Sequence, residues 1–208
     1  MAHETIQRIA DEKLFAVIRV RDTSTIPSFV QKITEAGISI IEVTLNSGGA
    51  IECIEELVHR FPKCLIGAGT VIGKKDSEAA IAAGAKFLVS PIVDTKMITV
   101  ARDNGVPSMA GALTPTEVFH AHTSGADFVK LFPLVGLGPA YVKALRGPLP
   151  QIRYVATNGV SPQNVGEYIA VGCTAAGLGS SLISDADIAA SDSDAVGKRA
   201  ATARAMVA

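Results

Sequence analysis

The chain lacks several features that mark particular classes of protein. It has no tryptophan, its three cysteines show no CxxC spacing, and its formal net charge is −1 without any run of basic residues. This charge balance argues against a nucleic-acid or anionic-membrane partner. No apolar run approaches the ~18 residues of a membrane span, and no basic stretch leads into an apolar core near the N-terminus. We therefore expect neither a secretory signal nor a membrane span, and we expect buried free thiols in a reducing cytoplasm.

What the chain does contain is a regular alternation of short apolar runs and amphipathic stretches. It has 208 residues, of which 48% are hydrophobic, enough for a large core. Eight runs are predicted as strands, at residues 14–20, 38–45, 64–68, 86–90, 107–111, 127–132, 153–157 and 174–178. Helical patterns fall between them, for example at residues 24–36, 50–60, 76–83, 139–146 and 162–171. Such alternation predicts parallel strands joined by right-handed crossovers.

A weak internal repeat indicates how these units are arranged. Gly37, Gly84, Gly125 and Gly172 each stand between a predicted helix end and a strand start, at intervals that fit two strand–helix units. Four such steps give eight units, which favours a closed (β/α)8 TIM barrel over an open doubly wound sheet. We expect a single barrel domain over residues 1–208, with an extra N-terminal helix near residues 4–12. Residues 184–194, rich in Ser, Asp and Ala, are predicted as a long loop before a C-terminal helix.

Lys130 is unusual because it stands at the centre of an apolar strand. Side chains alternate between the two faces of a strand, so Phe128, Lys130 and Phe132 share one face. If both faces are covered, desolvation disfavours the ammonium and favours a free amine that can form a Schiff base with a carbonyl carbon. The alternatives are a lysine at an exposed strand edge and a lysine neutralised by a buried carboxylate.

Other polar residues also fall at predicted strand ends, where barrels carry their chemistry. They are Arg19, Glu42, Thr44, Thr70, Ser90, Thr157, Asn158, Ser180 and Ser181. A carboxylate on an aliphatic strand is costly unless it is paired or protonated. If the second and sixth strands both point inward, Glu42 and Lys130 meet as an acid–base group and a nucleophile. The alternative is a structural ion pair.

Two loops are suited to a phosphate group. Residues 157–162, with Asn158 and Gly159, follow the seventh strand, and residues 177–181, with Gly179 and Ser180, follow the eighth. Glycine gives backbone N–H groups close access to an anion, and barrels bind phosphate after these two strands. The histidines show no metal-ligand spacing, so we expect no metal site.

Six motifs occur in the order seen in the KDPG/KHG aldolase family, which the chain resembles over nearly its whole length. They lie at residues 41–45, 66–71, 90–91, 113–117, 129–133 and 158–162. The resemblance implies a class I lyase without metal or cofactor that cleaves 2-keto-3-deoxy-6-phosphogluconate, or a close relative, into pyruvate and glyceraldehyde 3-phosphate. It implies that Lys130 forms the imine and that Glu42 shuttles protons. It also implies a substrate site that includes Thr70 and Pro91, and a cytoplasmic homotrimer.

The chain departs from the common family pattern at the mouth of the predicted barrel. Asn46 stands where many members have arginine, and Ser47 follows it. With Gly138, Pro139 and Tyr141, these residues are closer to the 6-phosphogalactonate branch. The departures leave the imine chemistry alone and concern substrate preference. Arg19 is suited to pair with a substrate carboxylate or phosphate, because arginine binds planar anions in a bidentate manner.

Two other functions remain open from the sequence. One is a phosphate-binding barrel isomerase or epimerase, in which Lys130 is an ion-pair or acid–base group. The other is a non-catalytic barrel that binds phosphorylated sugars. The combination of Glu42, Thr70 and Lys130 favours the aldolase.

Overall fold

A computed structural model describes residues 2–20 and 23–207, and its strands close into a parallel barrel in the order β1 to β8. The strands are β1 (Leu14–Ile18), β2 (Ile40–Thr44), β3 (Leu65–Gly69), β4 (Leu88–Val89), β5 (Ser108–Ala112), β6 (Phe128–Leu131), β7 (Tyr154–Thr157) and β8 (Ala175–Leu178). The ring closes between β1 and β8, where Leu14 is opposite Ala176. The predicted (β/α)8 barrel is therefore confirmed, with each strand within two residues of its expected bounds.

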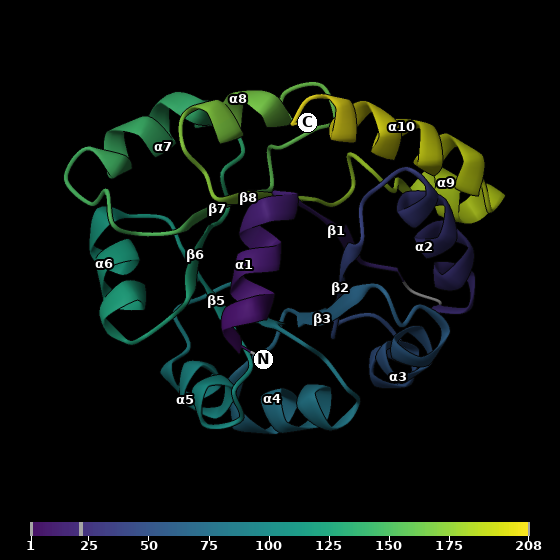
Figure 1. The fold of residues 1–208 in the computed structure, drawn as a ribbon, viewed down its shortest axis with the longest axis horizontal. Coiled ribbons are helices and arrows are strands. Elements are labelled where there is room, and N and C mark those ends of the chain that lie inside the picture. The colour runs from purple at the N-terminus through teal and green to yellow at the C-terminus, as the bar shows by residue number, and fades with distance from the viewer. Residues whose placement is uncertain (1, 21–22, 208) are drawn as a thin grey trace.

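Helices surround the barrel as a ring (Figure 1). They are α2 (Ile26–Glu35), α3 (Ala50–Arg60), α4 (Gly73–Ala82), α5 (Thr95–Asp103), α6 (Pro115–Thr123), α7 (Gly138–Arg146), α8 (Val165–Ala170), α9 (Asp185–Ala190) and α10 (Ser193–Ala205), with a 3-10 turn η1 (Thr23–Thr25) before α2. The extra N-terminal helix α1 (Ala2–Glu12) lies across the centre of this ring in Figure 1. It was expected near residues 4–12 and is confirmed.

The prediction of a long loop over residues 184–194 is wrong, because α9 occupies most of this segment. A capping box starts the helix: the Ser184 hydroxyl accepts from the Asp187 N–H, and the Asp187 carboxylate accepts from the Ser184 N–H at 2.7 Å. Arg199 of α10 also donates to the Asp187 carboxylate. These bonds satisfy donors that a short helix leaves free at its start, so a polar segment with few apolar residues can still be helical.

The alternation of side chains divides the core into two clusters. Phe15, Ile40, Phe87 and Phe128 belong to the cluster inside the barrel, to which α1 contributes Ile9. Their strand neighbours belong to the larger cluster between the barrel and the helices. The helix α1 therefore closes the amino end of the barrel, and the carboxyl end is left for the polar residues.

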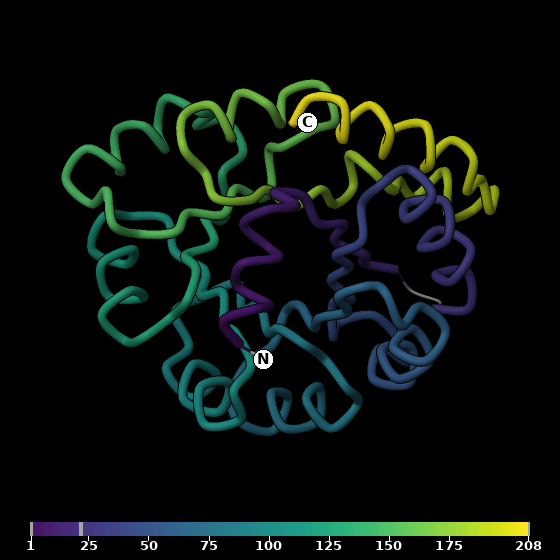
Figure 2. Tube along the Cα trace, viewed as in Figure 1, coloured from purple at the N-terminus to yellow at the C-terminus, as the bar shows by residue number. Residues whose placement is uncertain are grey.

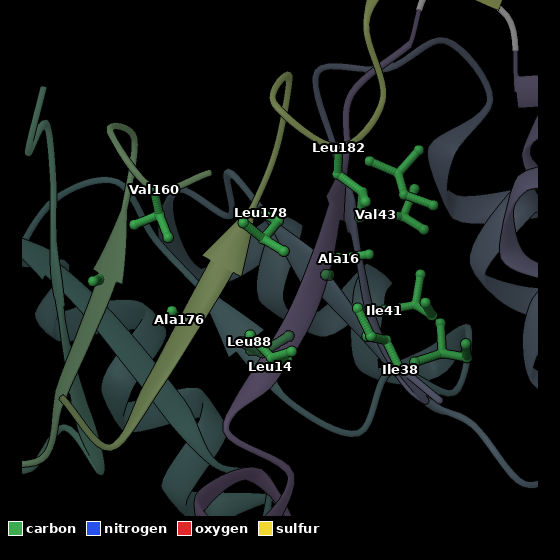
Figure 3. Close-up of a cluster of buried hydrophobic side chains, with 14 of the residues drawn as sticks. Leu14, Ala16, Ile38, Ile41, Val43, Leu88, Val160, Ala176, Leu178 and Leu182 are labelled. Atoms are coloured by element: carbon green, nitrogen blue, oxygen red, sulfur yellow. The ribbon is translucent and has the colours of Figure 1, made fainter. Parts of the chain in front are cut away.

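Ile38 comes two residues before Ile40 but does not share its inward-facing position. The strand begins at Ile40, and Ile38 belongs to the outer cluster together with Ile41 and Val43. Figure 3 shows these three side chains grouped together. The inward-facing residues of β2 are therefore Ile40, Glu42 and Thr44.

The chain ends close to where the ring of helices begins. The trace in Figure 2 brings α10 alongside α2, and the two helices are in contact. Arg204 of α10 donates to the carbonyl oxygen of Glu12 at 2.8 Å, which ties the two ends of the chain together. No helix in the described part of the chain is long and apolar enough to cross a membrane.

All three cysteines are free thiols, as expected. Cys53 and Cys173 are buried, and burial raises the pKa of each thiol to about 12. Cys64 is only half-buried, contrary to expectation, because it lies in the turn just before β3 rather than within the strand.

Candidate active site

Lys130 and Glu42 meet inside the carboxyl half of the barrel. Lys130 on β6 is 7% exposed and Glu42 on β2 is fully buried. The Lys130 Nζ lies 3.8 Å from the Glu42 Oε1, and it lies 5.4 Å from the centre of the Phe132 ring. The predicted convergence of these two strands is therefore confirmed. The lysine is neither at an exposed edge nor remote from a carboxylate.

The carboxyl group of Glu42 is held in a dry site. Neither of its oxygens has a hydrogen-bond partner among residues 2–20 and 23–207. Desolvation raises the pKa of Glu42, and the positive charges of Lys130 and Arg19 oppose this rise. A buried polar group without hydrogen bonds is costly to folding. Burial therefore makes Glu42 hold a proton more readily than an exposed glutamate does, which suits a group that must both give and accept a proton in acid–base catalysis.

Gly69 makes room for this carboxyl group. A Cβ atom at Gly69, on the neighbouring strand β3, would overlap the side chain of Glu42. At Gly111, a Cβ atom would overlap the backbone of Pro91, so the segment after β4 can approach β5 closely. No local pattern in residues 66–71 indicates this role for Gly69, because the side chain that fills the space comes from another strand.

A cavity of about 420 Å³ opens above the Lys130–Glu42 pair. Seven of the predicted site residues line it: Arg19, Lys130, Thr157, Asn158, Gly159, Gly179 and Ser180. Phe132, Ser161, Ser181 and Asp185 also line it. The sequence had placed Phe132 on the face of Lys130 and Ser161 and Ser181 in or beside the predicted phosphate loops, and it gave no signal for Asp185. Of the remaining predicted residues, Glu42 is buried beside Lys130, and Asn46, Thr70 and Pro91 are not among the lining residues.

The loops after β7 and β8 form one side of the cavity and are bonded to each other. The Ser181 hydroxyl donates to the Val160 carbonyl oxygen at 2.8 Å. Gly159 has a φ of 123°, a backbone conformation that residues with a side chain rarely adopt. A Cβ atom at this position would also lie 3.2 Å from the backbone of Leu134. The backbone at Gly159 is therefore close-packed, and the loop presents its edge to the cavity without a side chain.

Thr70 and Asn158 have left-handed backbone conformations, with φ of 56° and 58°. Asparagine tolerates this region, but a β-branched residue such as threonine is a genuine outlier there. Strain of this kind persists only where surrounding structure enforces it, and it concentrates at functional sites. Thr70 follows the carboxyl end of β3, next to the strand that carries Glu42.

Histidines play no part in this geometry. His3, His59 and His120 are exposed, and His122 is half-buried on α6. Within the described residues, no group of three or more His, Cys, Asp or Glu side chains could hold a metal ion. The lining of the cavity offers an amine, a guanidinium, the Asp185 carboxylate, several hydroxyl groups and the backbone of two loops, and the Glu42 carboxyl group lies buried beside the amine.

Comparison with known proteins assigns the chain to a family. The family model for KDPG and KHG aldolase matches residues 5–199. A probable 2-dehydro-3-deoxy-6-phosphogalactonate aldolase from Rhizobium meliloti is 37% identical over 174 residues, which are 83% of this chain and 82% of that protein. A 2-dehydro-3-deoxy-phosphogluconate aldolase from Pseudomonas aeruginosa is 34% identical over 162 residues, 77% of this chain and 74% of that one.

A solved structure agrees with these sequence matches. The KDPG aldolase from Legionella pneumophila, with pyruvate captured as a covalent carbinolamine intermediate, has a TM-score of 0.84 at 26% identity. The match covers 94% of this chain and 95% of that one. The resemblance read from the six sequence motifs is confirmed, and the chain belongs to the KDPG and KHG aldolase family.

Proposed function

We propose that the protein is a class I aldolase that cleaves 2-keto-3-deoxy-6-phosphogalactonate, or its 6-phosphogluconate epimer, into pyruvate and glyceraldehyde 3-phosphate. The observation that carries this proposal is the buried pair of Lys130 and Glu42 beside a cavity in a chain of this family. A structural ion pair at this depth would also satisfy charge balance. It would leave unexplained why the Glu42 oxygens have no hydrogen bonds among the described residues.

The reaction follows from the cleaved bond. The Lys130 amine attacks the C2 carbonyl carbon of the substrate, water leaves, and a protonated imine remains. Glu42, directly or through a water molecule, accepts the proton of the C4 hydroxyl. The C3–C4 bond then breaks, its electron pair moves toward the imine nitrogen, and glyceraldehyde 3-phosphate departs from an enamine. Glu42 returns a proton to C3, and water hydrolyses the imine to release pyruvate and restore the amine.

Other residues of the cavity can bind the two anionic ends of such a substrate. The loops at Gly159 and Ser180 hold the phosphate through backbone N–H groups. Thr157, Asn158 and Gly179 belong to the same side of the cavity. Arg19 binds an anionic group of the substrate, since its guanidinium offers paired donors.

The remaining predicted residues are not among those that line this cavity, and we expect them to reach the substrate from neighbouring strand ends. Thr70 and Pro91 lie near the pyruvate end. Asn46, which is exposed on the turn after β2, contributes to the choice between the two C4 epimers. An amide at this position can hydrogen-bond a sugar hydroxyl, and a site of that kind discriminates strongly against a misplaced hydroxyl. We expect the galactonate epimer to be accepted at least as well as the gluconate epimer.

The proposal extends to the assembly and its location. Residues 1–208 form one catalytic domain that assembles as a cytoplasmic homotrimer. Ile72, Ile92, Phe119 and Val135 are large apolar side chains that are 51–67% exposed. Ile72, Ile92 and Val135 lie in the segments that follow β3, β4 and β6 at the rim, and Phe119 lies on α6, the helix that follows β5. A second copy of the chain is the occupant that we propose for these residues. The free thiols support a reducing compartment.

Covalent trapping tests the proposed function. Borohydride reduces an imine to a stable secondary amine, so pyruvate plus borohydride should label Lys130 irreversibly. Peptide mapping locates the adduct, and Lys130→Met should abolish both labelling and turnover. Lys143, exposed on α7, provides the matched control, since Lys143→Met should be labelled like the parent. Labelling at another lysine, or none in an active protein, would rule out the imine mechanism and favour a barrel isomerase or a phosphosugar-binding protein.

A further inference from the structure

Two buried hydroxyl groups lie between the ends of β1 and β2. Thr44 is fully buried and Ser47 is 5% exposed. The Val20 N–H donates to the Ser47 Oγ at 3.2 Å, and the Thr44 Oγ1 donates to the Ile18 carbonyl oxygen, also at 3.2 Å. The two hydroxyl oxygens lie 3.2 Å apart. Ser47 therefore points into the protein, although the sequence had associated it with Asn46 at the mouth of the barrel.

The direction of these hydrogen bonds follows from counting protons. A hydroxyl group carries one proton to donate and has lone pairs that accept. Thr44 uses its proton on the Ile18 carbonyl, so Ser47 is the donor in the bond between the two hydroxyls. The result is a continuous relay from the Val20 N–H through Ser47 and Thr44 to the Ile18 carbonyl. Every donor and acceptor in it is satisfied, as buried polar groups require.

This relay holds the backbone on both sides of Arg19. The Ile18 carbonyl belongs to the peptide group before the Arg19 Cα, and the Val20 N–H belongs to the peptide group after it. Peptide groups are planar, so fixing both planes fixes φ and ψ of Arg19 and the direction of its Cα–Cβ bond. The paired register of β1 with β2 ends at Ile18, opposite Val43, so the relay extends the connection beyond the ladder.

The backbone of Arg19 has to be held in this way because few contacts hold its side chain. It lines the cavity together with Lys130, and its charge opposes the rise in the Glu42 pKa. No hydrogen bond or ion pair fixes its guanidinium within residues 2–20 and 23–207. The backbone therefore sets the region that the guanidinium can reach. A flexible side chain with a fixed Cα–Cβ bond can still adjust to bind an anion.

We propose that Ser47 and Thr44 are positioning residues that hold Arg19 over the cavity, where its guanidinium binds an anionic group of the substrate. The inference rests on the proposed function, because it assumes that an anionic substrate occupies this cavity. The anion is either the carboxylate next to the imine carbon or the terminal phosphate, and both offer the oxygen pairs that arginine binds.

A double-mutant cycle tests this role. Ser47→Ala removes the middle of the relay, and we expect KM for the phosphorylated substrate to rise about tenfold, the scale of one impaired hydrogen bond to a charged group, with a much smaller effect on kcat. Arg19→Ala should raise KM at least as much. In the Arg19→Ala background, adding Ser47→Ala should change KM by less than about twofold, because coupled residues give non-additive effects.

Further variants separate positioning from a general effect on folding. Thr44→Val should behave like Ser47→Ala, and Thr44→Ser, which keeps the hydroxyl, should restore a KM close to the parent value. Ser108→Ala removes another buried serine hydroxyl at the amino end of β5, so it should change the melting temperature without changing KM. If Ser47→Ala does not fold, the Thr44 pair gives the same comparison.

The outcomes distinguish this inference from the proposed function. An unchanged KM in Ser47→Ala, or an equal rise in KM with and without Arg19, would overturn the positioning role while leaving the aldolase intact. A parent protein that pyruvate and borohydride do not label would contradict the proposed function itself. Pyruvate labelling also identifies the anion. Weaker labelling of Ser47→Ala assigns Arg19 to the carboxylate, and unchanged labelling with a raised KM assigns it to the phosphate.

Discussion

At the scale of single residues, Glu42 is the side chain of the site whose burial costs folding free energy. Its pKa is raised above the ordinary value of 4.5, chiefly because burial desolvates the carboxylate. The folded protein therefore keeps this proton to a higher pH than the unfolded chain does. Between the two pKa values the folded state binds more protons, so the free energy of unfolding falls as pH rises through this window. The stability that protonated Glu42 contributes to the folded state is fully present below the pKa that this group has in the unfolded chain.

Replacing Glu42 with glutamine should remove this pH dependence. We expect the melting temperature of Glu42→Gln, relative to the parent, to increase as the pH rises above the ordinary glutamate pKa, because only the parent loses a proton from the buried carboxyl. Glu167→Gln, at an exposed position on α8, should show no such trend. A constant difference between Glu42→Gln and the parent would mean that Glu42 titrates normally.

The same variant should separate imine formation from turnover. Loss of a positioned acid–base group costs about 10²–10⁴-fold in rate, so turnover should collapse while some pyruvate labelling of Lys130 persists. A glutamine variant that turned over substrate at the parent rate would make Glu42 a structural partner of Lys130 and nothing more.

At the scale of secondary-structure elements, the important feature of the inner face of β3 is a missing side chain. Gly69 has no side chain, and the carboxyl group of Glu42 occupies the space where a Cβ atom would lie. The neighbouring strand β2 thus supplies the functional group, and β3 supplies the room for it. The glycines of residues 66–71 are explained by packing against Glu42 and Phe87.

Gly69→Ala should therefore impair catalysis through Glu42. The added methyl group displaces the carboxyl, and a misplacement of about 1 Å in a catalytic group can cost on the order of 10²-fold in rate, so we expect a fall of that size in kcat. Gly147→Ala is the matched control, since a Cβ atom there makes only an ordinary contact, 3.4 Å from the Ala144 carbonyl oxygen. Parent-like kcat in Gly69→Ala would show that Glu42 tolerates displacement.

The segment of helix α9 carries a helix-start pattern, but its composition led to the prediction of a loop. Its start carries a serine followed three residues later by an aspartate, which is a capping-box pattern. The small polar residues of this segment are equally typical of a loop. Helical structure is favoured here by the capping bonds and by Arg199, which also donates to the Leu182 carbonyl oxygen at 2.9 Å. That last contact comes from a helix later in the chain.

At the scale of the whole molecule, the exposed apolar residues of the rim lead to a prediction about assembly. Light scattering should give about three times the 21.5 kDa mass of one chain. Ile92→Asp places a charge in the proposed interface, where an unpaired buried charge is costly, so this variant should dissociate. Met206→Asp is the control, because Met206 is 47% exposed but follows α10, away from these residues in the chain. A monomeric parent would contradict the trimer.

The sequence by itself determined the architecture and the chemical character of the site. Alternation with a period of two separated the barrel interior from the helix-facing side, and the recurring helix-ending glycines set the number of units. A lysine and a glutamate on otherwise apolar strands were conspicuous for a local reason, since a buried charge is costly wherever the strand packs. These features depend on neighbours in the chain, so they can be read from it.

Only the tertiary structure decided which groups meet. Closure of the barrel brings the Lys130 Nζ to 3.8 Å from the Glu42 Oε1, although three strands separate β2 from β6 in the chain. The relay around Arg19 joins residues 26 and 27 positions apart, and the space at Gly69 exists only because a side chain of another strand fills it. Such contacts are set by strand register and side-chain packing between distant segments, and no local pattern specifies them.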